Sequence, residues 1–215
     1  MINVASIRRL FRAQLPDPDT GMLEIVNASF IADEPAIFGT PNEDWHKREL
    51  AWYLSESLNV NDIPEPIPAI WKQVASTSGE INSNYGWCIF SDANGNQFDN
   101  AIEALLRDRH SRQAVMIYNR PSMHTDCKRD GMRDFMCTHS THLMIRNGQL
   151  HCMVNMRSND AIFGYKGDYA WQKWVYNEAY KLLRARYPDL ATGPIYWNVG
   201  SLHVYPRHHH LVMSS

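Results

Sequence analysis

The chain has 215 residues, of which 44% are hydrophobic, and its formal net charge is −2 at pH 7. This length is enough to bury one sizeable core, and we expect a single domain spanning residues 1–215. The nearly neutral charge excludes a general attraction for nucleic acid or for an anionic membrane, so a phosphate must be bound locally by a few arginines. No apolar run approaches the ~20 residues of a membrane-spanning helix.

Helical periodicity occurs in four segments. In the first, Ile7, Leu10 and Phe11 follow helical spacing among arginines. That pattern is shared by transit peptides and surface helices, and we favour a surface helix with one apolar stripe. In the last segment, Asp168 stands at the expected start and is a candidate N-cap. The predicted helices span 3–13, 43–58, 98–109 and 168–186.

Strand-like runs rich in β-branched and aromatic residues lie between the helices. Asn147-Gly148 separates two of them and predicts a type I′ hairpin. Helices and strands do not alternate regularly, which predicts an α+β fold with one large mixed sheet and helices packed on a face. The predicted strands span 22–31, 85–91, 113–119, 141–146, 149–157 and 194–205.

The four cysteines show no compact disulfide spacing, which indicates reduced thiols in the cytoplasm. Cys137 is a candidate nucleophile, because Arg133 and Arg157 could approach it and cationic neighbours lower the pKa of a thiol. A small buried side chain is the commoner role of a lone cysteine. A zinc-stabilised binding module is the competing hypothesis, which metal analysis would test. It would use His124, Cys127, Cys137, His139 and His142, whose spacing is unusual for zinc.

Other polar residues suggest further parts of a site. Arg112 and the pair Arg157-Ser158 are candidate phosphate ligands, since guanidinium and hydroxyl groups suit phosphate oxygens. Glu49 precedes an apolar, aromatic stretch, where a carboxyl group can acquire a raised pKa and serve as an acid or base. His203 and Tyr205 alternate along one strand face and could serve a sugar hydroxyl. Each has an ordinary structural alternative.

Several long segments together resemble the thymidylate synthase superfamily, and within it the bacteriophage branch that acts on deoxycytidylate (dCMP) in T-even phages. Their order along nearly the whole chain makes chance similarity negligible. The matching segments are 28–30 with 32–35, 48–50, 79–87, 120–123, 134–138, 155–160, 168–173 and 197–205.

The resemblance implies a homodimer of α+β protomers with sheets packed back to back, and 5,10-methylenetetrahydrofolate as one-carbon donor without a metal. Cys137 would attack C6 of the pyrimidine and make C5 a carbon nucleophile. Addition of water then gives hydroxymethyl-dCMP for modified phage DNA, in the cytoplasm of the host. Hydride transfer from the folate would give methyl-dCMP instead, and CMP or dUMP are less favoured substrates. A non-catalytic partner of nucleotide synthesis is a further alternative, which the co-occurrence of Cys137, Glu49 and Asp168 disfavours.

The resemblance also implies a role for each candidate. Glu49 matches a proton-shuttling glutamate, and Tyr85 lies in the active-site wall. Arg157 and Ser158 match phosphate ligands, and Arg112 matches an arginine that reaches into the partner subunit's site. His203 and Tyr205 match the residues that contact the sugar. The residues that match folate contacts are Trp71, Asp160 and Gly164.

Asp168 stands where synthases carry asparagine. A carboxyl group can accept from the N4 amino group of cytosine, whereas uracil presents an acceptor there. The resemblance therefore implies that Asp168 selects dCMP over dUMP.

The chain departs from the synthases at several positions. Thr138 replaces their histidine, which fits a water network altered for hydration, and Gln113 replaces the second arginine of a Ser-Arg-Arg motif. A synthase Arg-Thr-Gly phosphate loop is missing near the N-terminus. The chain also stops ten residues after Tyr205, shorter than the family, and a less covered site would admit water.

Overall fold

A computed structural model describes residues 1–213 and has one mixed, five-stranded sheet with helices, as the α+β prediction required. The strand order is β1-β5-β4-β3-β2, in which β4 and β5 pair in parallel and the other three neighbouring pairs are antiparallel. The strands are β1 (Leu23–Ile31), β2 (Val115–Ile117), β3 (Thr138–Arg146), β4 (Gln149–Asp160) and β5 (Ala191–Val204).

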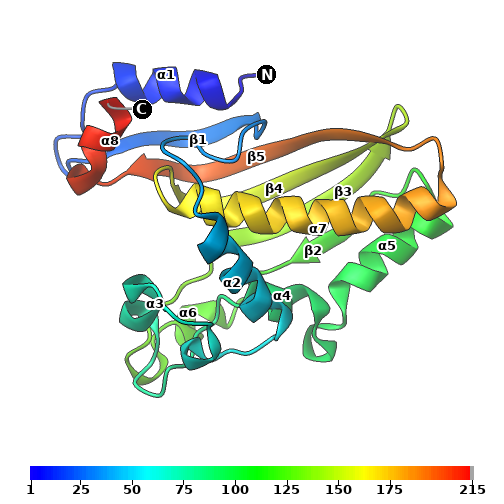
Figure 1. The fold of residues 1–215 in the computed structure, drawn as a ribbon, viewed down its shortest axis with the longest axis horizontal. Coiled ribbons are helices and arrows are strands. Elements are labelled where there is room, and N and C mark those ends of the chain that lie inside the picture. Colours follow the sequence, from blue (N-terminus) through cyan, green and yellow to red (C-terminus); the bar gives the residue numbers. More distant parts are fainter. Residues whose placement is uncertain (214–215) are drawn as a thin grey trace.

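Helix α7 has 23 residues, whereas α1, α2 and α5 have 10 to 12 and the others are shorter. Figure 1 shows α7 running along the sheet, with α5 and α2 beside it and α1 with α8 next to β1. The α-helices are α1 (Val4–Ala13), α2 (Glu43–Leu54), α3 (Ala69–Val74), α4 (Tyr85–Phe90), α5 (Gln97–Arg107), α6 (Met123–Asp126), α7 (Gly164–Arg186) and α8 (His209–Met213). The short 3-10 helices are η1 (Val60–Asp62), η2 (Asp92–Asn94), η3 (Arg129–Gly131) and η4 (Pro206–His208).

The core lies between α7 and one face of the sheet. Strand β4 alternates buried and half-buried residues, so that Leu150, Cys152 and Val154 lie in the core. The other face carries half-buried residues, among them Met153 and Tyr196, which pair across β4 and β5. In α1, Val4, Ile7 and Phe11 form the buried stripe, while Leu10 is 47% exposed. The surface-helix interpretation of this segment is therefore confirmed.

The hairpin prediction is confirmed, because Asn147 and Gly148 both have positive φ and connect β3 to β4. The predicted strand at 85–91 is wrong, since Tyr85–Phe90 form α4. The Asn84 side chain accepts from Trp87 N at 2.8 Å and caps the helix. A Cβ on Gly86 would lie 1.9 Å from Tyr53 O, so the helix packs directly on backbone there. The aromatic content reflected burial rather than an extended chain.

Two other element boundaries affect the site. Helix α2 ends at Leu54 instead of residue 58, and Glu56 beyond it has positive φ. Helix α7 begins at Gly164, four residues earlier than predicted. Asp168 is therefore not an N-cap, and the cap interpretation of this residue is wrong. Its carboxyl group lies one turn inside the helix and is available for other partners.

Candidate active site

The N-terminus of α7 is organised by a turn at the end of β4. Asp160 accepts from Ile162 N at 2.9 Å and from Phe163 N at 3.4 Å, which holds the chain as it leaves the strand. Gly164 then begins the helix. This turn places Asp168 beside β4 and opposite α4.

Asp168 has a hydrogen-bond donor on each carboxyl oxygen. Tyr85 Oη donates to Oδ1 at 3.1 Å, and Asn159 Nδ2 donates to Oδ2 at 2.7 Å. Burial raises the pKa of Asp168 to about 7, while the two hydrogen bonds oppose that rise. The group can thus gain or lose a proton near neutral pH and still has lone pairs for a ligand.

Tyr85 connects this carboxyl group to the strand that follows the nucleophile candidate. Its hydroxyl accepts from Thr138 Oγ1 at 3.0 Å, and its ring stacks on Tyr53 with centroids 5.3 Å apart. Thr138 directly follows Cys137. Tyr85 therefore links the segment of Cys137 to Asp168.

Cys137 and Arg157 lie together, as the sequence interpretation anticipated. Arg157 Nη2 is 3.6 Å from Cys137 Sγ, and the guanidinium group also donates to Met136 O at 3.0 Å and to Phe135 O at 2.8 Å. The expectation of a lowered thiol pKa is wrong. Burial raises the pKa of Cys137 to about 11, against the opposing effect of Arg157. Arg133, the other cation considered, is exposed.

Nearby carboxylates also raise the pKa of the Cys137 thiol. Asp168 and Asp134 both raise the pKa of Cys137 through their negative charge. Asp134 is itself buried and accepts from Ser83 Oγ, Ser83 N and Asn82 N, each at 2.7 Å. In the free protein the thiol therefore holds its proton at neutral pH.

Glu49 is a buried carboxyl group on α2, with 7% of its surface exposed. Burial and then the charge of Asp168 raise its pKa to about 8, and a hydrogen bond from Tyr53 opposes the rise. A Cβ on Gly167 would lie 3.1 Å from Glu49 Oε2, so this glycine lets the carboxyl group pack against α7. Glu49 and Asp168 are thus two buried acids whose pKa values lie near neutral pH, where each can gain or lose a proton.

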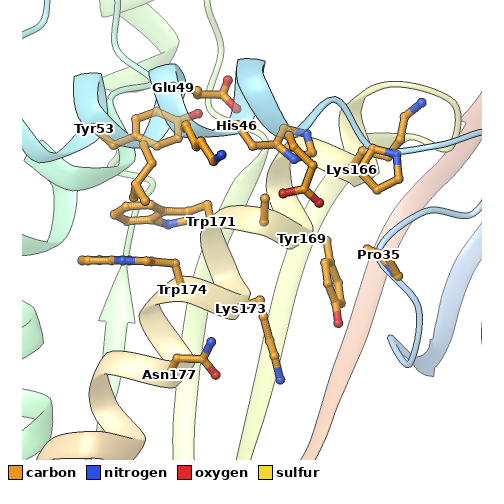
Figure 2. Close-up of a pocket in the computed structure, with 16 residues that line it drawn as sticks. Pro35, His46, Glu49, Tyr53, Lys166, Tyr169, Trp171, Lys173, Trp174 and Asn177 are labelled. Atoms are coloured by element: carbon orange, nitrogen blue, oxygen red, sulfur yellow. The ribbon is translucent and has the colours of Figure 1, made fainter.

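A groove of about 300 Å³ lies between α2 and α7 and borders Glu49. Figure 2 shows Glu49 and Tyr53 at one end, with Trp171 stacked on Trp174 and Lys173 farther along α7. Cys137 and Asp168 do not line this groove. Because neither of these residues lines the groove, we do not identify the groove with the site of nucleophilic attack.

The candidate sugar ligands lie at the end of β5. His203 is buried opposite Asp160 in the parallel pairing of β4 and β5. The ring of Tyr205 meets the His203 ring edge-on at 4.8 Å. Ser158, the second phosphate candidate, is half-buried on β4 next to Arg157.

Two other candidates lie apart from this group. Arg112 is exposed in the loop before β2, and within residues 1–213 no hydrogen bond or ion pair joins it to Cys137 or Arg157. Trp71 on α3 packs edge-on against Trp52 at 5.1 Å. The structure thus connects Cys137, Arg157, Tyr85 and Asp168 in one group and leaves Arg112 and Trp71 apart from it.

Sequence reasoning missed Asn159 and Trp197 as parts of the site. Trp197 Nε1 donates to Asn159 Oδ1 at 3.1 Å, and both residues are buried. Asn159 follows the phosphate candidates directly in the chain, which was the one available signal. Its partner Trp197 is 38 residues away, and only the parallel pairing of β4 with β5 brings the two together.

The metal alternative finds no geometric support in the part of the chain that is described. Across residues 1–213, no three His, Cys, Asp or Glu side chains gather as they would around a metal ion. All four cysteines are free thiols. No helix in the same range is long and apolar enough to cross a membrane.

Comparison with known proteins gives matches over most of the chain. A family model described as thymidylate synthase matches residues 43–215. The deoxycytidylate 5-hydroxymethyltransferases of Enterobacteria phages T6 and T4 are 53% and 52% identical to the chain over 192 residues, which is 88% of this chain and 78% of each relative. A thymidylate synthase of Francisella tularensis subsp. holarctica is 27% identical over 173 residues, covering 74% of this chain and 60% of that enzyme.

Proposed function

The chain belongs to the thymidylate synthase family, and from this premise we propose that it is a deoxycytidylate 5-hydroxymethyltransferase. The enzyme transfers a one-carbon unit from 5,10-methylenetetrahydrofolate to C5 of dCMP and completes the reaction with water. The phage relatives bearing this name are 52–53% identical to it over 88% of the chain. The work of the enzyme is to supply modified nucleotides for phage DNA in the host cytoplasm.

The observation that carries this proposal is the environment of Asp168. Its two oxygens already face donors, Tyr85 Oη and Asn159 Nδ2, so a ligand meets acceptor lone pairs. The N4 amino group of cytosine supplies a donor, whereas O4 of uracil would meet a second acceptor. An unpaired buried polar group costs on the order of 1–3 kcal/mol, which favours dCMP.

The covalent steps fall to Cys137. Its sulfur adds to C6 of the pyrimidine as its proton leaves, and C5 becomes nucleophilic and bonds to the one-carbon unit. C5 then loses its proton as the bond between the methylene carbon and a nitrogen of tetrahydrofolate breaks, so that tetrahydrofolate leaves and an exocyclic methylene group remains. Water adds to the exocyclic methylene carbon, the bond between sulfur and C6 breaks, and Cys137 is restored. Glu49 is suited to proton movements in these steps because its pKa of about 8 lies near working pH.

Arg157 and Ser158 hold the phosphate in this proposal, while His203 and Tyr205 contact the sugar. Arg157 is partly committed to Phe135 O and Met136 O, so it is positioned before the nucleotide arrives. A positioned guanidinium group loses little entropy on binding phosphate. The same residues therefore hold C6 of the base near Cys137.

When it is bound, the folate co-substrate supplies a one-carbon unit at the methylene oxidation level. Trp71, Asp160 and Gly164 are the residues proposed to hold it. Trp71 offers aromatic surface to a flat ring, and so does Phe163, which precedes Gly164 in the chain and is 56% exposed. Together with the carboxyl group of Asp160, these aromatic surfaces suit a flat ring with polar edges.

The proposed assembly is a homodimer of single-domain protomers, residues 1–215, packed through their sheets. The support is the second face of the sheet, which presents half-buried residues such as Met153 and Tyr196. Arg112, exposed in one protomer, reaches the phosphate of the partner's site in this arrangement.

Product analysis tests the function. The purified protein is incubated with dCMP and methylenetetrahydrofolate, and the mass of the nucleotide product is measured. We expect hydroxymethyl-dCMP, which exceeds methyl-dCMP by one oxygen. Methyl-dCMP with release of dihydrofolate would instead assign the methyltransferase reaction, and an absence of any product from dCMP would contradict the proposal. CMP and dUMP, assayed in parallel, define the nucleotide specificity.

A further inference from the structure

Asn159 lies between Trp197 and Asp168, and its carboxamide has one permitted orientation. Asn159 Oδ1 accepts from Trp197 Nε1 at 3.1 Å, and Asn159 Nδ2 donates to Asp168 Oδ2 at 2.7 Å. An indole N–H is only a donor, and an ionised carboxylate is only an acceptor. A rotated amide would place donor against donor at Trp197 and acceptor against acceptor at Asp168.

Burial makes this orientation stringent. Asn159 is 3% exposed and Trp197 is fully buried, so water cannot replace a lost partner easily. Gly164 also contributes, because a Cβ at that position would lie 3.3 Å from Asn159 Nδ2. The amide thus has both fixed partners and the space that it needs.

The second oxygen of Asp168 is held in a related way. Tyr85 Oη accepts from Thr138 Oγ1 at 3.0 Å and donates its own proton to Asp168 Oδ1 at 3.1 Å. Position 168 therefore faces two donors that are oriented by residues behind them. Such a position suits an acceptor side chain and disfavours a neutral amide.

We propose that Asn159, oriented by Trp197, is a positioning residue for nucleotide specificity. It holds Asp168 as a hydrogen-bond acceptor and thereby favours an exocyclic amino group, as in cytosine, over a carbonyl oxygen, as in uracil. This role rests on the proposed function and assigns part of its substrate selection to a residue behind the base-reading carboxylate.

The first test compares kcat/KM for dCMP and dUMP in Asn159→Ala, with Asn100→Ala as the matched control. Asn100 also uses its amide, donating to Gly95 O at 2.6 Å, but lies exposed on α5. We expect the dCMP/dUMP ratio to fall about tenfold or more in Asn159→Ala, the worth of one strong hydrogen bond. The control keeps the ratio of the unmodified protein. An equal loss for both nucleotides would overturn the proposal, because a merely structural role predicts that result.

The pH dependence provides a second readout. The hydrogen bond from Asn159 lowers the pKa of Asp168, so its removal moves the titration of Asp168 to higher pH. We expect the corresponding limb of the kcat/KM profile to move in that direction in Asn159→Ala. Trp197→Phe retains the Asn159 amide but removes the N–H group that fixes its orientation. We expect the dCMP/dUMP ratio to fall in this variant, by less than in Asn159→Ala. An unchanged ratio in a folded Trp197→Phe protein would overturn the orienting role.

A pair of isosteric variants tests the orientation directly. In Asp168→Asn, the oxygen of the new amide must face Asn159 Nδ2, and its NH2 group must face Tyr85. Adding Asn159→Asp places an acceptor there and turns the amide of position 168 over. We expect the dUMP/dCMP ratios of the single and double variants to differ at least tenfold, and equal ratios would overturn the proposal.

Failure of the proposed function is distinguishable from failure of this inference. If the unmodified protein makes no product from dCMP, the proposed function fails. If it makes hydroxymethyl-dCMP while the ratios of the variants stay unchanged, the function stands and the role of Asn159 fails.

Discussion

The hydroxyl of Tyr85 lies 3.1 Å from Oδ1 of Asp168 and joins α4 to α7 across the candidate site. The same hydroxyl accepts from Thr138, the residue that follows Cys137. One tyrosine therefore connects the segment of the proposed nucleophile with the carboxylate proposed to read the base. A change in this hydroxyl should affect both functions of the site.

Tyr85→Phe removes that hydroxyl and retains the aromatic ring that stacks on Tyr53. We expect kcat/KM for dCMP to fall about 10- to 100-fold, because a hydrogen bond to a charged group contributes roughly 1.5–3 kcal/mol. Steady-state kinetics provide the measurement. Tyr187→Phe is the control, since the Tyr187 hydroxyl bonds Leu105 O instead. Equal losses in the two variants would contradict a specific role for Tyr85.

Cys137→Ser should abolish turnover, by on the order of a thousandfold or more, because the oxygen is a poor nucleophile at neutral pH. The fold should remain, since the change replaces only sulfur by oxygen. Mass spectrometry of the denatured protein after incubation with dCMP and the folate should also lose any nucleotide adduct. Cys127→Ser, at a buried thiol that has no part in the proposed chemistry, should keep activity. Turnover in Cys137→Ser near that of the control would exclude covalent catalysis by this residue.

Local signals made much of the fold predictable from sequence. Asn147-Gly148 specifies a tight hairpin by its own backbone preferences, and the structure contains that hairpin. The segment 85–91 was mispredicted because its aromatic residues are equally suited to a buried helix. The helix forms because Asn84 caps it and because Gly86 packs against Tyr53 O. The second of these is a tertiary contact, which the local sequence does not reveal.

Glu49→Gln should change how stability depends on pH. The pKa of Glu49 is raised from 4.5 to about 8 in the folded protein, so the folded state holds a proton that the unfolded chain releases. The free energy of unfolding therefore falls as pH rises from about 4.5 to about 8. Glutamine removes this contribution, and the Tm of the variant should rise relative to the unmodified protein as pH increases.

Thermal unfolding across that range measures the effect, with roughly 2–4 °C expected per kcal/mol in a chain of this size. Glu103→Gln, on the exposed side of α5, is the control, and its Tm should depend on pH in the same way as the Tm of the unmodified protein. A Glu49→Gln curve that is also parallel would show that Glu49 has no raised pKa.

Arg157→Lys should weaken nucleotide binding more than it lowers kcat, the turnover of the bound nucleotide. Lysine cannot donate simultaneously to Phe135 O, Met136 O and a phosphate in the way that the guanidinium group can. We expect KM for dCMP to rise at least tenfold and inhibition by inorganic phosphate to weaken with it. Arg109→Lys, in an exposed ion pair with Asp189, is the control. An unchanged KM in Arg157→Lys would remove Arg157 from the phosphate site.

The site was less predictable than the fold, for a physical reason. The approach of Arg157 to Cys137 followed from charge considerations, but the thiol pKa rose because burial outweighed the guanidinium charge. Burial cannot be read from spacing along the chain. Asn159 was missed for the same reason, because its role depends on an indole brought to it by parallel strand pairing.

Selection of cytosine by Asp168 is the central claim, and Asp168→Asn tests it most directly. The measurement is kcat/KM for dCMP and for dUMP in the unmodified protein and in the variant, at one pH. Asp99→Asn on α5 serves as the control, because Asp99 lies on the exposed side of that helix. We predict that the unmodified protein and the control prefer dCMP and that Asp168→Asn loses this preference by about 10- to 100-fold, the worth of one or two mispaired hydrogen bonds. An unchanged preference for dCMP in a folded Asp168→Asn protein would contradict the account.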